Sequence, residues 1–269
     1  MKVGIVGAGV FGCVIAKALS KHCDVTVFDC RKKEAASKCS GFLMKDSWFA
    51  GLGKKITEPA LDMLGSLYKI QSIKFKVGPL RTLVYRIAKD KVLEGVEVVE
   101  EKVKGIGNGR YIVTNERERE FDAIIVAAGI WSNGFFPKLQ VTGKKGISFE
   151  WEGNVKRPFI RPWAPYKQVV VFNVPEEENK VWGGDGSAIK QENWTDERER
   201  ECLKRVAKAA GLDASEAKQN VGIRPFVEGR THVLEKVGKR YWVATGGGKN
   251  GTILAGYVAS QLEEKLSGE

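Results

Sequence analysis

The sequence predicts an α/β protein whose parallel sheet, opened by a βαβ unit, is interrupted by an inserted and mainly antiparallel β domain. Three observations support this prediction. The chain begins with an apolar run, a glycine turn and a helical segment. Near its end, the apolar strand expected at residues 241–244 is again followed by a glycine turn and a helix. Between these parts lie segments rich in aromatic and β-branched residues, which favour antiparallel strands: residues 146–151, 169–174 and 180–183.

Composition indicates a folded protein that stays in the cytoplasm. The 269 residues are 43% hydrophobic and 29% charged, which allows a sizeable core. No stretch approaches the ~18 consecutive apolar residues needed to span a bilayer. The first apolar run carries glycines at structural spacing, unlike a signal peptide. The five cysteines show no CxxC spacing, so we expect neither a disulfide framework nor a metal site.

The formal net charge of +11 has two interpretations. A lysine-rich surface that maintains solubility would explain it, and so would attraction of an acidic partner such as RNA or an anionic substrate. The positive residues are spread along the chain and no RNA-binding motif accompanies them. We therefore do not expect nucleic-acid binding, although the charge alone leaves it open.

The elements of the first half follow from hydrophobic pattern and turn residues. Apolar runs predict strands at residues 2–6 and 25–28, with a helix at 10–19 between them. Proline-initiated patterns predict helices at residues 57–67 and 79–88. Further strands are expected at residues 96–99, 103–106, 110–114 and 121–126, with a hairpin turn at Asn108-Gly109.

Helix signals are clear in the second half. Thr195 is expected to cap a helix that runs to about residue 210, because acidic residues fill its first turn and Gly211 follows its last. A final helix is expected at residues 252–266.

The opening turn matches a dinucleotide-binding fingerprint. Gly7, Gly9 and Gly12 form GxGxxG between a strand and a helix, where they allow a tight turn, close approach of a pyrophosphate and close helix–strand packing. Asp29 lies where an acid binds a ribose hydroxyl pair. This context predicts a Rossmann-like fold, but it does not separate FAD from NAD, and Arg31 could contact a 2′-phosphate.

Two later segments favour a flavin. Residues 121–129 form an apolar strand closed by small residues, which let the chain pass under a flat cofactor. The turn at residues 246–251 leads into a helix whose positive end can stabilise charge on the N1–C2=O edge of an isoalloxazine ring. A simple NAD dehydrogenase has no need of this second glycine junction.

These motifs, with others in the same order, resemble the FAD-dependent amine and amino-acid oxidoreductases typified by D-amino acid oxidase, glycine oxidase and sarcosine oxidase. The resemblance covers nearly the whole chain. Besides the opening motif and Asp29, it rests on residues 35–41, 78–83, 121–132, 182–184, 222–225 and 246–251.

The resemblance implies oxidation of the C–N bond of an amine or amino acid by hydride transfer to flavin N5. Arg224, in the GxRP segment, is expected to bind the substrate carboxylate through its planar fork. Lys249 is a second candidate for touching flavin or substrate. The residues expected to bind FAD are Gly7, Gly9, Val10, Phe11, Gly12, Asp29, Cys30, Arg31, Ser40, Gly41, Val103, Ala128, Gly129, Trp131, Gly247, Gly248, Lys249, Asn250, Gly251 and Thr252.

The same resemblance implies a division into two domains. Residues 1–44, 78–135 and 222–269 are expected to form the FAD-binding domain, and residues 45–77 and 136–221 a small substrate domain. Family members are usually longer in the substrate domain, so a homo- or hetero-oligomer could complete the pocket. A covalent flavin link at Cys39 is not expected.

Two alternatives stay open from the sequence. One is an NAD(P)-dependent dehydrogenase. The other is a flavin-binding subunit, or an RNA-modifying flavoprotein, that needs a partner.

Overall fold

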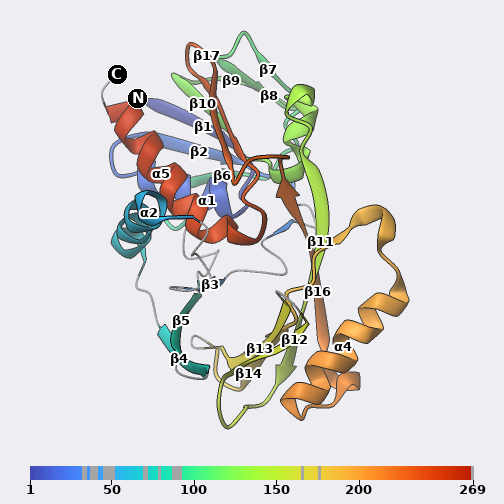
Figure 1. The fold of residues 1–269 in the computed structure, drawn as a ribbon. Helices are drawn as coiled ribbons and strands as arrows, with labels where there is room; N and C mark the ends of the chain where they lie inside the picture. The colour runs from blue at the N-terminus through green and yellow to red at the C-terminus, as the bar shows by residue number, and fades with distance from the viewer. Residues whose placement is uncertain are drawn as a thin grey trace.

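The computed structural model describes residues 1–31, 35–36, 42–44, 52–68, 72–77, 80–86, 93–164, 167–174 and 177–267. Its centre is a six-stranded sheet in the order β17-β18-β10-β1-β2-β6 (Figure 1). All neighbouring pairs are parallel except β17–β18. The strands are β1 (Lys2–Val6), β2 (Asp24–Phe28), β6 (Glu97–Val99), β10 (Ala123–Val126), β17 (Val233–Gly238) and β18 (Tyr241–Thr245). This arrangement confirms the predicted fold class.

Helices α1 (Val10–Leu19) and α5 (Gly251–Ser267) cover one face of this sheet, and α2 (Lys54–Leu67) packs against both helices. Alternate strand residues such as Val3, Ile5 and Val27 are fully buried against them in one apolar cluster. Burial of these apolar side chains stabilises the domain. It holds the strand ends in fixed positions relative to the starts of α1 and α5.

The other face of the sheet carries a small three-stranded sheet of β7 (Gly105–Gly107), β8 (Tyr111–Val113) and β9 (Glu118–Glu120). Val6, Phe28 and Ile124 alternate with the helix-facing residues and pack against Ile112 of β8. Gly4 permits this contact, because a Cβ atom there would lie 2.6 Å from Ile112 Cδ1. Both faces of the strands are thus buried, as expected for a parallel sheet.

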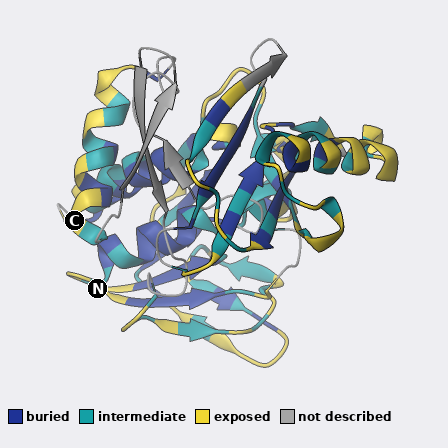
Figure 2. Cartoon of the chain, turned by 90° about the horizontal axis from the view of Figure 1, so that it is seen from below, coloured by how far each residue is buried: buried dark blue, intermediate teal, exposed yellow. Residues whose placement is uncertain are grey.

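A second, antiparallel sheet extends from the first (Figure 1). Its order is β12-β13-β14-β11-β15, and β16 also pairs with β11. Phe149, Trp151 and Val171 are buried with Val206 of helix α4 (Asp196–Ala210), and Figure 2 shows the buried strands bordered by exposed loops. The strands are β11 (Thr142–Glu152), β12 (Phe159–Ala164), β13 (Lys167–Asn173), β14 (Lys180–Gly184), β15 (Ile189–Lys190) and β16 (Lys218–Phe226).

The helix expected at residues 79–88 is wrong. Leu80–Arg86 is strand β5, which pairs with β3 (Phe42–Met44) and β4 (Ser72–Val77) in an antiparallel sheet. Thr82, Val84 and Tyr85 favour a strand, and the Gly78-Pro79 dipeptide is a turn signal rather than a helix start.

The other expected helices are present. The Thr195 hydroxyl accepts a hydrogen bond from the Arg198 N–H, and Gly211 ends α4 in a left-handed conformation. Sequence reasoning missed strands β3, β4, β9, β12, β15, β16 and β17, and it did not foresee the short 3-10 helices. These are η3 (Gly129–Gly134), η4 (Pro137–Leu139), η5 (Gln191–Asn193), η6 (Ala214–Glu216) and η7 (Gly248–Asn250). No helix among the described residues is long and apolar enough to cross a membrane.

The position of α2 bears on the domain division. Ala60, Met63 and Leu64 of α2 are buried in the cluster shared with α1 and α5, whereas the expected division gave residues 45–77 to the small domain. We therefore propose a division that places α2 with the nucleotide-binding domain.

A matched pair of glycine substitutions tests the contact of α2 with α5. In Gly256→Ala, the new Cβ would lie 2.6 Å from the Ala60 carbonyl oxygen, so we expect a loss of about 1–3 kcal/mol of unfolding free energy. In Gly65→Ala, no described atom lies within 4 Å, so removal of a helical glycine should add about 0.5–1 kcal/mol. Urea denaturation measures both, and changes of the same sign would contradict this packing.

Candidate functional site

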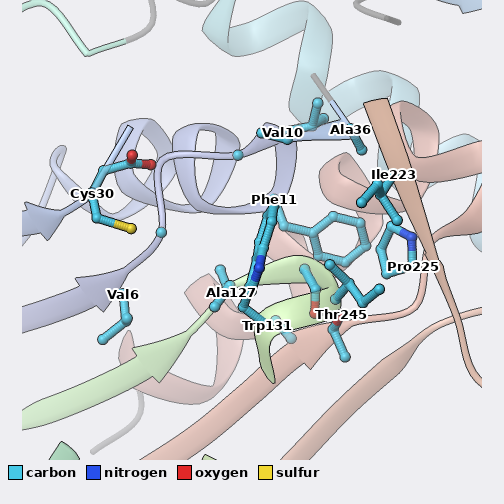
Figure 3. A pocket seen from close by; sticks show the side chains of 18 of the residues that line it. Val6, Val10, Phe11, Cys30, Ala36, Ala127, Trp131, Ile223, Pro225 and Thr245 are labelled. Carbon is cyan, nitrogen blue, oxygen red and sulfur yellow. Dashed lines mark hydrogen bonds between the residues drawn. The ribbon is translucent and has the colours of Figure 1, made fainter. Parts of the chain in front are cut away.

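A cavity of about 510 Å³ lies where the carboxyl ends of the parallel strands meet the second sheet. Ligands of open α/β sheets bind in this crevice outside the strand ends. The cavity is lined by the segments that follow β1, β2, β10 and β18, and by β16. Figure 3 shows side chains from these segments gathered around one space: Val6, Val10, Phe11, Ala36, Ala127, Trp131, Ile223, Pro225 and Thr245.

The glycines of the first turn have different physical roles. Gly7 has φ +102°, and a Cβ there would lie 2.7 Å from the Ala127 carbonyl oxygen. A Cβ at Gly12 would lie 1.8 Å from the Gly7 oxygen, so Gly12 is required for the turn itself. By contrast, no described atom lies within 4 Å of a Cβ at Gly9, which lines the cavity. The missing side chain at Gly9 therefore leaves space for a ligand, whereas at Gly7 and Gly12 it allows close packing within the protein.

Two helix N-termini face this cavity. Helix α1 begins after Gly9, which makes no side-chain capping bond, and its first turn holds no acidic residue. Helix α5 begins at Gly251 with no acidic residue in its first turn, and Gly251 and Thr252 line the cavity. Free N–H groups and the positive end of the helix dipole favour an anionic group at each start.

Asp29 is held in place by the backbone. Its Oδ2 accepts a hydrogen bond from the Ala8 N–H and its Oδ1 from the Arg31 N–H. A carboxylate offers about four acceptor positions, so capacity for a ribose hydroxyl pair is left. Arg31 is engaged elsewhere, because its Nε and Nη2 donate to Glu100 at 3.0 and 2.6 Å. This pairing and the adjacent acid disfavour a 2′-phosphate here.

Lysines flank the Asp29 end of the cavity. Val103 lines the cavity between the exposed Lys102 and Lys104. Glu101 also lines it, but its carboxylate is bound to Arg117 and to the Thr114 hydroxyl. The Glu101 charge is thus paired within the protein, and Lys102 and Lys104 place two further positive charges at this end.

Arg224 lies at the other end of the cavity, on β16. Its guanidinium rests against Gly146 of β11, where a Cβ would come within 2.5 Å of Cζ. Its Nη1 donates to the Ser187 carbonyl at 3.0 Å. Within the described part of the chain, no carboxylate lies within ion-pair distance of it. Arg224 is therefore a half-buried positive charge at the cavity, with donors left free for a ligand.

The structure places most predicted residues around this cavity, and their roles stay proposals. Gly12 and Asn250 do not line it, and Ser40 and Gly41 lie outside the described residues. The predicted residues that line it are Gly7, Gly9, Val10, Phe11, Asp29, Cys30, Arg31, Val103, Ala128, Gly129, Trp131, Arg224, Gly247, Gly248, Lys249, Gly251 and Thr252.

Several lining residues were missed. Ala36, Ile130 and Ile223 lie within segments on which the resemblance rests but were not expected to line the site, and Phe135 lies outside those segments. His232 does not line the cavity, and burial lowers its pKa below the ordinary value. Among the described residues, no cluster of side chains is suited to hold a metal ion.

The observed features fit an extended dinucleotide. An open Gly9, an uncapped α1 and a fixed Asp29 suit its pyrophosphate and ribose, and the start of α5 suits a second electron-rich group. The class defined by fold and site is thus a dinucleotide-binding α/β protein. Residues 5–33 match a model of NAD(P)-binding Rossmann-like domains.

Residues 80–264, more than half of the chain, match the model of the FAD dependent oxidoreductases. The chain belongs to this family, and its cofactor is FAD. Comparison with curated protein sequences gave no match.

Solved structures share the fold over nearly the full chain. L-proline dehydrogenase from P. horikoshii matches with a TM-score of 0.74 at 13% identity, covering 99% of this chain and 93% of that one. Glycine oxidase from Bacillus cereus matches with a TM-score of 0.73 at 15% identity, covering 99% and 97%. NikD, described as an unusual amino acid oxidase, matches with a TM-score of 0.71 at 12% identity, covering 97% and 93%.

Alanine substitutions at Gly9 and Gly12 should separate cofactor binding from folding. Gly9→Ala should leave the melting temperature of the FAD-free protein unchanged but weaken FAD binding at least about tenfold, or ~1.4 kcal/mol, since its methyl group points into ligand space. Gly12→Ala should cost about 3 kcal/mol of stability even without FAD, because of the clash with Gly7. Thermal melting and FAD titration measure the two effects. Equal effects of both substitutions on folding would contradict the assignment.

Proposed function

We propose that the protein oxidises the C–N bond of an amine or amino acid, and that Arg224 binds the substrate carboxylate. The observation that carries this proposal is the position of Arg224, a residue that lines the cavity and has no carboxylate partner among the described residues. A planar guanidinium can hold both oxygens of a carboxylate, and the interaction strengthens away from bulk water. The titles of the similar structures name L-proline dehydrogenase, glycine oxidase and an amino acid oxidase, which supports this substrate class.

The proposed roles of the FAD-binding residues follow from where they lie. The starts of α1 and α5 would hold the pyrophosphate and the electron-rich edge of the flavin ring, and Asp29 the ribose hydroxyls. Val103 would contact the adenine side, and Trp131 and Gly129 would line the cofactor cavity near β10.

Bound FAD supplies a hydride acceptor, and the chain positions the substrate against it. Phe11, Ile130 and Ile223 contribute apolar surface to the cavity, which limits water around the reacting carbon. No histidine of the described residues lines the cavity, and Asp29 and Glu101 are bound to internal partners. The amine would therefore enter neutral, with its proton lost to solvent, and catalysis would rest mainly on orientation.

Two finer points belong to the same proposal. A cytoplasmic location is expected from the sequence. A neighbouring subunit that covers the cavity would be visible as an oligomer in light scattering.

The alternative function makes a different prediction. A bound flavin that no amine or amino acid reduces, together with salt-sensitive RNA binding, would favour the flavin-binding subunit or RNA-modifying alternative.

Arg224→Ala tests the carboxylate site with paired ligands. The FAD-loaded protein is titrated anaerobically with L-proline and pyrrolidine, and with glycine and methylamine, and the flavin absorbance is followed. Loss of a charge-assisted contact of about 1.5–3 kcal/mol should raise the half-saturating concentration of the amino acid about 10–100-fold. The decarboxylated partner should change less than about threefold.

Two further variants sharpen this comparison. Gly146→Ala should displace the guanidinium while keeping its charge, and so weaken amino-acid binding in the same selective way. Lys144→Ala is the control, because Lys144 is the cross-strand neighbour of Arg224 but does not line the cavity. Equal effects of Arg224→Ala on both members of a pair would remove its proposed role.

A further inference from the structure

Asp185 is a fully buried carboxylate outside the cavity. It follows β14, and its side chain is 0% exposed. Its Oδ1 accepts a hydrogen bond from the Ser187 N–H at 2.9 Å. Its Oδ2 accepts from the Cys202 thiol at 3.2 Å and forms an ion pair with Arg205, both on α4. Burying a carboxylate is costly unless it is paired, and the ion pair with Arg205 offsets that cost.

The turn of residues 185–187, which the Asp185 carboxylate closes, is hydrogen-bonded to Arg224. Gly186 has φ +69°, a left-handed conformation that glycine adopts readily. The Asp185 carboxylate fixes the N–H of Ser187, and the carbonyl of the same Ser187 accepts from Arg224 Nη1 at 3.0 Å. The orientation of one residue, Ser187, therefore couples the buried carboxylate to the guanidinium in the cavity.

The guanidinium is confined from a second side. A Cβ atom at Gly146 of β11 would lie 2.5–2.6 Å from Cζ and both terminal nitrogens of Arg224, so the guanidinium packs directly against the Gly146 backbone. The guanidinium also donates a hydrogen bond to the Ser187 carbonyl. Long arginine side chains lose entropy when they are held in one geometry, so such fixed contacts pre-organise the fork for a ligand.

We propose that Asp185 is a positioning residue for Arg224: held to α4 through Arg205, it fixes the 185–187 turn and so aims the Arg224 guanidinium at the substrate carboxylate. This inference rests on the proposed function of Arg224. It assigns the Arg205–Asp185 ion pair to substrate selection rather than to stability alone.

The surroundings of Asp185 support this role. Ser187 is 4% exposed, so little water competes for the hydrogen bond between its N–H and the carboxylate. The Arg205 side chain is 28% exposed and needs no full desolvation to pair with Asp185. Burial, and then the adjacent Asp185 charge, raises the pKa of Cys202 to about 11, so its thiol keeps the proton that it donates.

Asp185→Ala and Asp185→Asn test the proposal in the FAD-loaded protein, with L-proline and pyrrolidine as anaerobic probes of flavin absorbance. A small misplacement of a binding group has a large effect, so Asp185→Ala should raise the half-saturating L-proline concentration about tenfold and that of pyrrolidine less than about twofold. Asp185→Asn keeps an oxygen acceptor for the Ser187 N–H and should restore part of the preference, to within about threefold of wild type. FAD affinity should stay unchanged in both.

Val206→Ala is the matched control. Val206 is fully buried on α4 and has no bond to Asp185, so this variant should lower the melting temperature without changing the preference for L-proline. Should Asp185→Ala fail to fold, the comparison of Asp185→Asn with Val206→Ala decides: a selective loss of L-proline preference of up to about threefold in the asparagine variant alone supports the proposal, and an unchanged preference overturns it.

The outcomes separate the two levels of the argument. If Arg224→Ala loses the preference for L-proline and both Asp185 variants keep it, the positioning role is overturned and the proposed function stands. If Arg224→Ala keeps the preference, the proposed carboxylate site fails and the positioning role fails with it. An equal loss in Val206→Ala would attribute the effect to general destabilisation and also overturn the positioning role.

Discussion

The close approach of the first glycine turn to the end of β10 is the constraint on which the site depends. Gly7 packs its backbone against the Ala127 carbonyl, and Gly12 packs against Gly7. Side chains at these positions would push the start of α1 away from the strand ends. With the turn compact, the N–H groups of α1, the Asp29 carboxylate and the end of β10 converge on one cavity. The second sheet then brings Arg224 to the opposite end through the pairing of β11 with β16.

Charge is distributed unevenly around this cavity. Its acidic residues are bound to internal partners, Asp29 to backbone N–H groups and Glu101 to Arg117. Positive groups remain at both ends, at Lys102 and Lys104 near Asp29 and at Arg224 on β16. This arrangement suits an anionic cofactor at one end and an anionic substrate at the other. It gives part of the +11 net charge a role that requires no nucleic acid.

The nucleotide-binding half could be predicted because its signals are local. GxGxxG, an acid after the second strand and a glycine turn before a helix each state a backbone requirement within a few residues. Helix α4 could be predicted for the same reason, since Thr195 and Gly211 mark its ends. The error at residues 79–88 arose where local signals conflict, because a proline after a glycine can begin a helix or a hairpin. Pairing of Leu80–Arg86 with two other strands decided the outcome.

The substrate half was harder to predict, because its contacts join distant residues. Arg224 was singled out from its motif, but nothing in the sequence shows that Ser187 and Gly146 confine it. Asp185 was overlooked altogether, since a single acid after a strand usually faces solvent. Its burial depends on α4 folding back over β14. Similarly, Ile223 and Phe135 line the cavity only because β16 and η3 meet beside β10.

The most direct test of the account is the melting temperature of the cofactor-free protein as a function of added FAD, NAD and NADP. A ligand that binds only the folded state stabilises it by RT ln(1 + [L]/Kd), so the melting temperature should rise steadily with FAD concentration. We expect this rise for FAD and no comparable rise for NAD or NADP. A protein that NAD or NADP stabilises while FAD does not would contradict it.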